Sequence, residues 1–273
     1  ERQGEGGEDR GEGDLALCRS ALWEALALGF RAPTEETAAR LASPEGAQAL
    51  ADAAALLDAA GGTDLASRVL RLARGDGLAA LEDSFSSLFG HTARGAVPPY
   101  ESEYGEDSLF LPAQEMSDLA AFYRAFGLAL NAAAHERIDH VSCQCEFLLL
   151  LARKEAYALE RADAAMLDAT RGAVRLFLRD HLGRWAPAFG RKLARGDGGS
   201  FYGALGDLCR AFVTWECARR GGHTEAISFG LVDQPCREGA SGFRERVYRA
   251  ASFSATSSSF SLVMVVRTRA DMS

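Results

Sequence analysis

Apolar residues recur at helical spacing over most of the chain from Leu15 onward. Between residues 201 and 215 they follow one another at alternating four- and three-residue steps: Phe201, Leu205, Leu208, Phe212 and Trp215. A second apolar stripe before Gly127 consists of Leu119, Phe122 and Phe126, and glycine is common just after a helix. No stretch before residue 220 shows the sustained β-branched alternation of a strand. The pattern therefore predicts an all-α protein built as a single helical bundle.

Breaks in this periodicity divide the chain. Residues 1–14 hold no apolar side chain, which predicts a disordered acidic lead. Residues 15–221 form the expected helical domain, in which glycine pairs separate short antiparallel helices between 47 and 90. Residues 222–273 lose the helical spacing and end in a short apolar run, so we expect an irregular tail. Disorder, a strand and a shifted reading frame all remain open for that tail.

Two features mark functional candidates within the helical part. Residues 91–114 are rich in glycine and proline and predict a long loop, a kind of segment that is often functional in a compact domain. Asp139 stands before an apolar stripe that includes Val141, Cys145 and Leu148, so we expect it to cap the helix that follows.

Composition narrows the class of protein. The formal net charge of -8 argues against a nucleic-acid binder, which needs a basic surface. No apolar run approaches the ~20 residues of a membrane span, and no basic patch followed by an apolar stretch opens the chain. The six cysteines form no C-x-x-C pair, which favours buried free thiols in a reducing compartment. We therefore expect a cytoplasmic protein without stable membrane insertion.

The negative charge is concentrated. Residues 95–123 carry six acids and no Lys or Arg, namely Glu101, Glu103, Glu106, Asp107, Glu115 and Asp118. Such a run is often only a solvated surface, but it also attracts cationic ligands, because neighbouring acids reinforce one another's field. Metal binding is a third option, although these residues lack the spacing of a calcium loop.

Catalytic motifs are absent from the sequence. It contains no G-x-S-x-G, no phosphate-binding glycine loop and no H-E-x-x-H. Glu-x-x-His pairs of a di-iron bundle are missing as well, and the sequence implies no cofactor. An enzyme that uses His140 and His181, either hydrolytic or metal-dependent, remains an alternative, although each histidine also fits a structural role.

Several motifs taken together resemble one known family. In order they are Phe85-Ser-Ser-Leu-Phe89, Pro98-Pro-Tyr-Glu-Ser-Glu-Tyr104, Leu119–Leu128, Ile138-Asp-His-Val-Ser142 with Glu146-Phe-Leu148, Phe177–Phe189, and Phe201-Tyr202. Residues 85–216 are similar in this order to the TorD/DmsD/NarJ family of cytoplasmic chaperones for molybdenum-cofactor enzymes. The match departs at Ile138, where the family usually has proline, and the tail after residue 221 finds no counterpart.

The resemblance implies an all-α, non-enzymatic chaperone that binds the N-terminal region of an apo molybdopterin oxidoreductase catalytic subunit. That region is often a twin-arginine signal peptide, and cofactor insertion then precedes export. Molybdenum-cofactor biosynthesis proteins are further partners to expect, and the chaperone is a monomer or a homodimer. The resemblance assigns peptide binding to two groups of residues: Tyr100, Glu101, Ser102 and Tyr104 in the loop, and Asp139, His140 and Glu146 at the helix start.

The charge pattern fits such a ligand. Arginine engages carboxylates through paired hydrogen bonds, and two such contacts contribute roughly 3–6 kcal/mol. Micromolar binding requires about 8 kcal/mol, so apolar contacts must supply the remainder. Tyr100, Tyr104 and a groove lined by Phe147 or Trp185 are the candidates. A general helical adaptor for basic peptides would use the same chemistry and remains an alternative.

Overall fold

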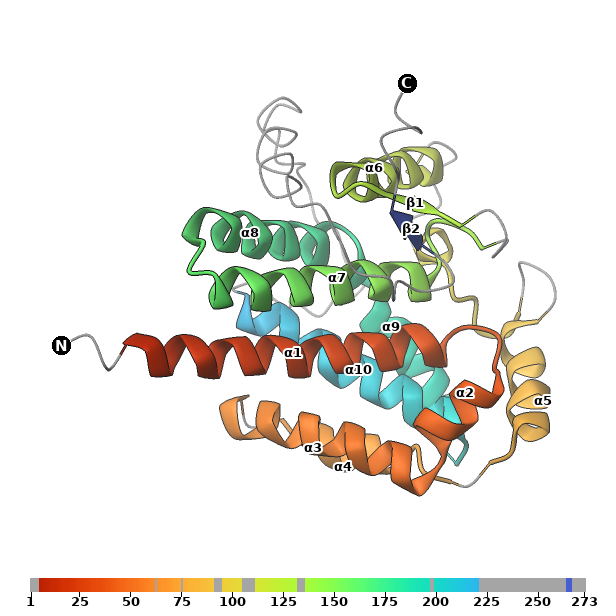
Figure 1. The fold of residues 1–273 in the computed structure, drawn as a ribbon. Coiled ribbons are helices and arrows are strands. Elements are labelled where there is room, and N and C mark those ends of the chain that lie inside the picture. Colours follow the sequence, from red (N-terminus) through yellow and green to blue (C-terminus); the bar gives the residue numbers. More distant parts are fainter. Residues whose placement is uncertain are drawn as a thin grey trace.

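The computed structural model describes residues 5–61, 63–74, 76–90, 95–104, 111–131, 136–196, 199–220 and 264–266. Its N-terminal part contains α1 (Glu5–Gly29), α2 (Glu35–Thr37), the π-helical η1 (Ala38–Ala42), α3 (Pro44–Gly61), α4 (Leu65–Leu70) and α5 (Leu78–Phe89). There follow the short 3₁₀ helix η2 (Glu101–Glu103), α6 (Leu111–Ala125), β1 (Leu128–Leu130), α7 (Val141–Glu160), α8 (Ala164–Asp180), α9 (Leu182–Gly196), α10 (Phe201–Arg219) and β2 (Met264–Val266). Helices dominate, so the all-α prediction is confirmed (Figure 1).

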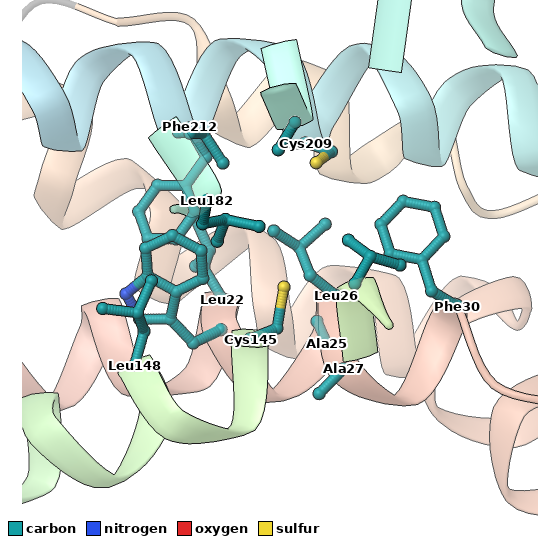
Figure 2. Packing of buried hydrophobic residues seen from close by; sticks show 14 of the residues in the cluster. Leu22, Ala25, Leu26, Ala27, Phe30, Cys145, Leu148, Leu182, Cys209 and Phe212 are labelled. Carbon is teal, nitrogen blue, oxygen red and sulfur yellow. The ribbon is translucent and has the colours of Figure 1, made fainter. Parts of the chain in front are cut away.

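The core lies between the long helices. α1 packs along α7, and the two helices run in opposite directions (Figure 1). α9 packs against α10. Figure 2 shows the interior where these helices meet; its labelled side chains include Leu22 and Leu26 from α1, Phe30 just after it, Cys145 and Leu148 from α7, Leu182 from α9, and Cys209 and Phe212 from α10. The rings of Trp23 and Phe212 lie 4.6 Å apart. The predicted stripe of α10 is therefore core.

The first helix begins at Glu5, so the predicted disordered lead is wrong from that residue onward. Arg171 of α8 pairs with Glu12, with 2.6 Å between Nη2 and Oε2, and ties the acidic turns to the bundle. The composition of residues 1–14 does not reveal this contact with Arg171. Residues 1–4 lie outside the described residues.

A second apolar layer joins α6 to α7 and α8 through aromatic rings. Phe122 lies edge-on to Phe177 at 5.3 Å between centroids, and Phe126 lies edge-on to Phe147 at 5.2 Å. α6 ends where Gly127 adopts φ +71°, the left-handed conformation that the glycine at this position predicts. The turn leads directly into β1.

Part of the tail forms a strand. β2 pairs antiparallel with β1, with Val265 opposite Ala129. Of the three possibilities left open for the tail, a strand is therefore present at residues 264–266, while residues 221–263 and 267–273 lie outside the described residues. Whether residues 15–221 form one independent domain stays a prediction.

Two expectations from composition can be compared with the fold. Five cysteines, Cys18, Cys143, Cys145, Cys209 and Cys217, are buried and free, while Cys236 lies outside the described residues. Among the described helices, none combines the length and apolar character needed to cross a membrane.

Candidate functional site

The backbone brings the predicted loop and the predicted helix start together. Tyr100 and His140 form an isolated antiparallel bridge. Beside it, the N–H of Glu101 donates to the carbonyl of Asp139 at 3.1 Å, and the N–H of Val141 donates to the carbonyl of Pro99 at 2.9 Å. Residues almost 40 positions apart therefore form one backbone unit, which holds their side chains in fixed relation.

The carboxylate of Asp139 is the centre of this unit and is only 1% exposed. The backbone N–H and the hydroxyl of Ser102 donate to its Oδ2 at 3.3 and 2.8 Å. Arg137 donates from Nε to Oδ1 at 3.1 Å and from Nη2 to Oδ2 at 2.8 Å, the paired geometry that guanidinium and carboxylate favour. Because these groups occupy its oxygens, Asp139 does not cap α7 as predicted.

His140 caps α7 instead. Its Nδ1 accepts from the N–H of Ser142 at 3.2 Å, so the neutral ring carries its proton on Nε2. Burial, together with the nearby cations Arg31 and Arg137, lowers the pKa of His140 from 6.5 to about 3. The imidazole is therefore neutral at pH 7. Its ring lies edge-on to Tyr100, with 5.3 Å between centroids.

Glu101 points into the protein and is 4% exposed. Its Oε1 lies 3.1 Å from Nδ1 of His181, and its Oε2 accepts from the side-chain amide of Gln144. Gln144 in turn accepts from the indole N–H of Trp185 at 3.3 Å. This chain of hydrogen bonds fastens η2 to α7 and α9, so Glu101 positions the loop from within.

The apolar groove predicted beside the loop is not lined by Phe147 or Trp185. Phe147 and Trp185 are buried core side chains, so neither lines an open groove and that prediction is wrong. Tyr104 is half-buried and packs on Trp185 at 5.2 Å between centroids. Burial raises the pKa of Tyr104 well above its usual value. Tyr100, also half-buried, is the aromatic side chain that accompanies Asp139.

Glu146 serves another part of the bundle. It is buried in α7 and pairs with Arg31, which follows α1. Cys143 and Cys145 flank it on the same helix. The structure thus brings Tyr100, Glu101, Ser102, Asp139 and His140 into one unit and gives Glu146 a separate ion pair.

Only part of the acidic run remains available at the surface. Glu103 and Asp118 are exposed, and Glu115 is half-buried. Burial raises the pKa of Glu115, and the carboxylate of Glu101 adds to the effect. Glu106 and Asp107 lie outside the described residues.

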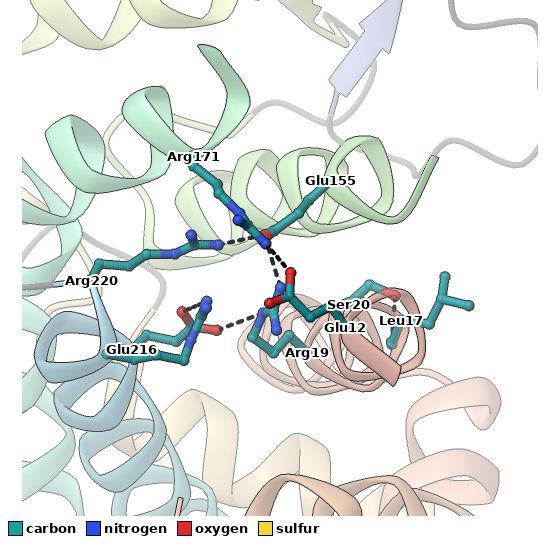
Figure 3. Close-up of polar contacts among 9 residues, drawn as sticks. Glu12, Leu17, Arg19, Ser20, Glu155, Arg171, Glu216 and Arg220 are labelled. Atoms are coloured by element: carbon teal, nitrogen blue, oxygen red, sulfur yellow. Dashed lines mark hydrogen bonds and ion pairs between the residues drawn. The ribbon is translucent and has the colours of Figure 1, made fainter. Parts of the chain in front are cut away.

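A second polar cluster lies at the other end of α7. Arg19, Arg171 and Arg220 converge on Glu155, with 2.8 Å contacts from Arg19 Nη2 to Oε2 and from Arg171 Nε to Oε1 (Figure 3). These guanidinium groups hold the pKa of Glu155 down, from 4.5 to about 2, against the opposing effect of burial. The neighbouring cavity of about 440 Å³ is also lined by Leu57 and Trp215. Each arginine of the cluster pairs with a carboxylate. These ion pairs connect α1, α7, α8 and α10.

The alternative of an enzyme that uses His140 and His181 concerns two buried side chains. No group of three or more metal-ligating side chains gathers among the described residues. His181 is buried against Phe122 and Phe177, the structural role that its spacing favours.

Comparison with known proteins identifies the family. Residues 42–191 match the family described as nitrate reductase delta subunit. The chain belongs to this family. The resemblance to NarJ and TorD proteins read from the sequence motifs is thereby confirmed.

Several relatives carry chaperone names. The chain is 31% identical over 142 residues to "Chaperone protein TorD" of Vibrio cholerae serotype O1 (strain M66-2), which covers 51% of this chain and 62% of that protein. It is 33% identical over 96 residues, 35% of this chain and 42% of the relative, to the perchlorate reductase assembly chaperone protein of Dechloromonas aromatica (strain RCB). It is 36% identical over 98 residues to the selenate reductase assembly chaperone protein of Thauera selenatis, or 35% and 50% of the two chains. The chain thus matches less than two thirds of each of these relatives, and no solved structure matches it significantly.

Sequence reasoning missed three participants in the two polar clusters. Arg137 stands two residues before Asp139, so the sequence shows that the two are close but not that their side chains form an ion pair. Gln144 lies one turn after His140 in the same helix, and nothing in the sequence distinguishes it from a glutamine on the helix surface. Glu155 gave no signal at all, because its partners come from distant helices.

Proposed function

We propose that this protein is a non-enzymatic assembly chaperone that binds the N-terminal region of a molybdopterin oxidoreductase catalytic subunit before cofactor insertion. Family membership supports the general role, because the matched relatives are named as chaperones of TorD type or of perchlorate and selenate reductase assembly. The proposed client segment is a peptide with adjacent arginines followed by an apolar stretch. A cytoplasmic location before export is part of the same proposal.

The observation that carries the peptide-binding site is the unit formed by Tyr100, Ser102 and Asp139. A buried carboxylate, a hydroxyl and an aromatic ring face one guanidinium there, which is the full set of groups that recognises arginine. The exposed acid Glu103 is next in the chain and offers a second contact. Sequence motifs assigned these residues to the peptide, and the geometry supplies a chemical reason.

The buried members Glu101, His140 and Glu146 have a different task in this proposal. Their partners are internal, so Glu101 and His140 hold the site and Glu146 stabilises the bundle through its own ion pair, while Tyr100, Ser102 and Asp139 touch the peptide. One guanidinium contributes roughly 1.5–3 kcal/mol through charge-assisted hydrogen bonds. Because micromolar binding needs about 8 kcal/mol, apolar residues of the client must add the larger share.

Calorimetric titration of the full-length protein tests the proposal. The probe is a synthetic peptide of two adjacent arginines followed by a leucine- and alanine-rich stretch, and the control peptide has both arginines replaced by glutamine. We expect the arginine peptide to bind at least about tenfold more tightly, the equivalent of one lost charge-assisted contact. Equal affinity for the two peptides would contradict arginine recognition.

A pair of variants locates the site. Asp139→Asn removes the charge without changing the shape and should cost about tenfold in affinity for the arginine peptide. Asp207→Asn is the matched control, because Asp207 also holds arginines, Arg68 and Arg210, on α4 and α10. Equal losses in both variants would point to general electrostatics. Stoichiometric metal in the purified protein would favour the alternative of an enzyme that uses His140 and His181.

Partner identification separates the specific chaperone from a general adaptor. Purification from the native host should recover a molybdopterin-containing catalytic subunit with the protein. Recovery of unrelated basic proteins would favour the adaptor. The same preparation gives the oligomeric state, for which both a monomer and a homodimer are expected possibilities, and shows whether cofactor-biosynthesis proteins take part.

A further inference from the structure

The guanidinium of Arg137 sits inside the unit just described. It lies over the ring of Tyr100, with 4.2 Å from Cζ to the ring centroid. Its Nη2 donates to Oδ2 of Asp139 and also to the hydroxyl of Ser102, each at 2.8 Å. The three groups that contact it come from two chain segments, so they form a receptor for a guanidinium group.

The side chain of Arg137 is more exposed to solvent than the carboxylate that it contacts. It is 38% exposed, whereas Asp139 is 1% exposed. Arg137 precedes α7 and belongs to the loop, so a change of its rotamers leaves the helix intact. The receptor itself is held by backbone hydrogen bonds that do not involve the guanidinium, from Glu101 to Asp139 and from Val141 to Pro99.

A buried carboxylate needs a partner at all times. Leaving a charge unpaired in the interior is strongly destabilising, so Asp139 requires a cation both before and after the client arrives. Arg137 fulfils this need in the free protein. An arginine from outside can take its place without leaving the carboxylate unpaired, because the exchange keeps one guanidinium in the receptor.

We propose that Arg137 occupies, in the free protein, the guanidinium pocket of Tyr100, Ser102 and Asp139 in which an arginine of the client peptide binds. This inference rests on the proposed function and adds its regulation. Arg137 competes with the client for the pocket. The apparent affinity for the client is therefore the intrinsic affinity multiplied by the fraction of molecules in which the pocket is open. It also favours release of the client, since Arg137 can return to the pocket.

Removing the internal guanidinium provides the test. Full-length Arg137→Ala should bind the arginine peptide about tenfold more tightly than the wild type, because its pocket is open. Arg137→Lys keeps the charge but loses the paired contact and should gain less. Arg153→Ala is the matched control, since the side chain of Arg153 is 36% exposed and pairs with Glu24 at 2.9 Å away from the pocket. It should leave the affinity unchanged.

A second measurement probes the pocket without the client. Methylguanidinium at about 50 mM should raise the Tm of Arg137→Ala by about 1–3 °C relative to the same concentration of methylammonium. The wild type, whose pocket is filled, should show no such rise. This readout also tells an open pocket from a merely destabilised variant.

The outcomes separate the two proposals. Tighter peptide binding by Arg137→Ala together with rescue by methylguanidinium supports both. Arginine-dependent binding to the wild type without any gain in Arg137→Ala overturns the inference and leaves the proposed function standing. Rescue by methylguanidinium without peptide binding to either protein overturns the proposed function and the client's part in the inference.

Discussion

Glu155 is a buried carboxylate shared by three arginines, and neutralising it should weaken the fold in a pH-dependent way. Glu155→Gln keeps the size of the side chain but removes the charge that three arginines share. Because the pKa of Glu155 falls from 4.5 to about 2, the ionised form stabilises the fold by about 3 kcal/mol at pH 7. The side chain is 2% exposed, so solvent screening reduces this little.

The sign of the pH dependence follows from the lowered pKa. The stabilisation is fully present above the unfolded pKa of 4.5 and is lost as the pH falls toward 2. By pH 3, about 2 kcal/mol of it should be gone. At pH 7 the variant removes the carboxylate that pairs with Arg220, whereas Arg19 and Arg171 keep Glu216 and Glu12, and breaking a buried pair costs about 3–5 kcal/mol.

Urea unfolding at pH 7 and at pH 3 measures both effects. The free energy of unfolding of Glu155→Gln should lie about 3 kcal/mol below the wild type at pH 7, and the gap should shrink by about 2 kcal/mol at pH 3. Glu160→Gln is the control, because Glu160 is exposed on the same helix. A gap that stays constant between the two pH values would refute the electrostatic explanation.

Two further substitutions test the packing that supports the site. Gly127→Ala should destabilise the protein by about 1–2 kcal/mol, because φ is +71° and a Cβ there meets open space, so the cost comes from the backbone alone. Thermal unfolding checks this, and an unchanged Tm would contradict it. Phe177→Ala should cost about 3–5 kcal/mol, since its ring packs on Phe122 and Phe147. A loss below about 1 kcal/mol in urea unfolding would mean that the α6–α8 layer is not a packed core.

The sequence predicts the helical class because apolar spacing reports burial directly. The stripe of α10 from Phe201 to Phe212 is buried as its spacing predicts, and Trp215 at its end is partly buried. The start of α1 was out of reach, since the Glu12–Arg171 pair that anchors it depends on a helix more than 150 residues away. Local composition does not contain that information.

In the candidate site, too, some features could be predicted from the sequence and others depend on contacts between distant segments. Motif order placed Tyr100 and Asp139 in one site, and the bridge between Tyr100 and His140 joins them. Which acids face outward was not predictable, because Glu101 and Glu103 have the same chemistry and differ only in direction on η2. The capping role passed from Asp139 to His140 for a similar reason. The carboxylate of Asp139 is instead bound by Arg137, two residues before it, and by Ser102, which only the tertiary fold brings near.

The affinity of the Asp139→Asn variant for the arginine peptide tests the central claim most directly. The account predicts that wild-type protein prefers the arginine peptide over its glutamine counterpart and that Asp139→Asn loses this preference while Asp207→Asn keeps it. An Asp139→Asn variant that is folded, with the Tm of the wild type, and that still prefers the arginine peptide to the same degree would contradict the account.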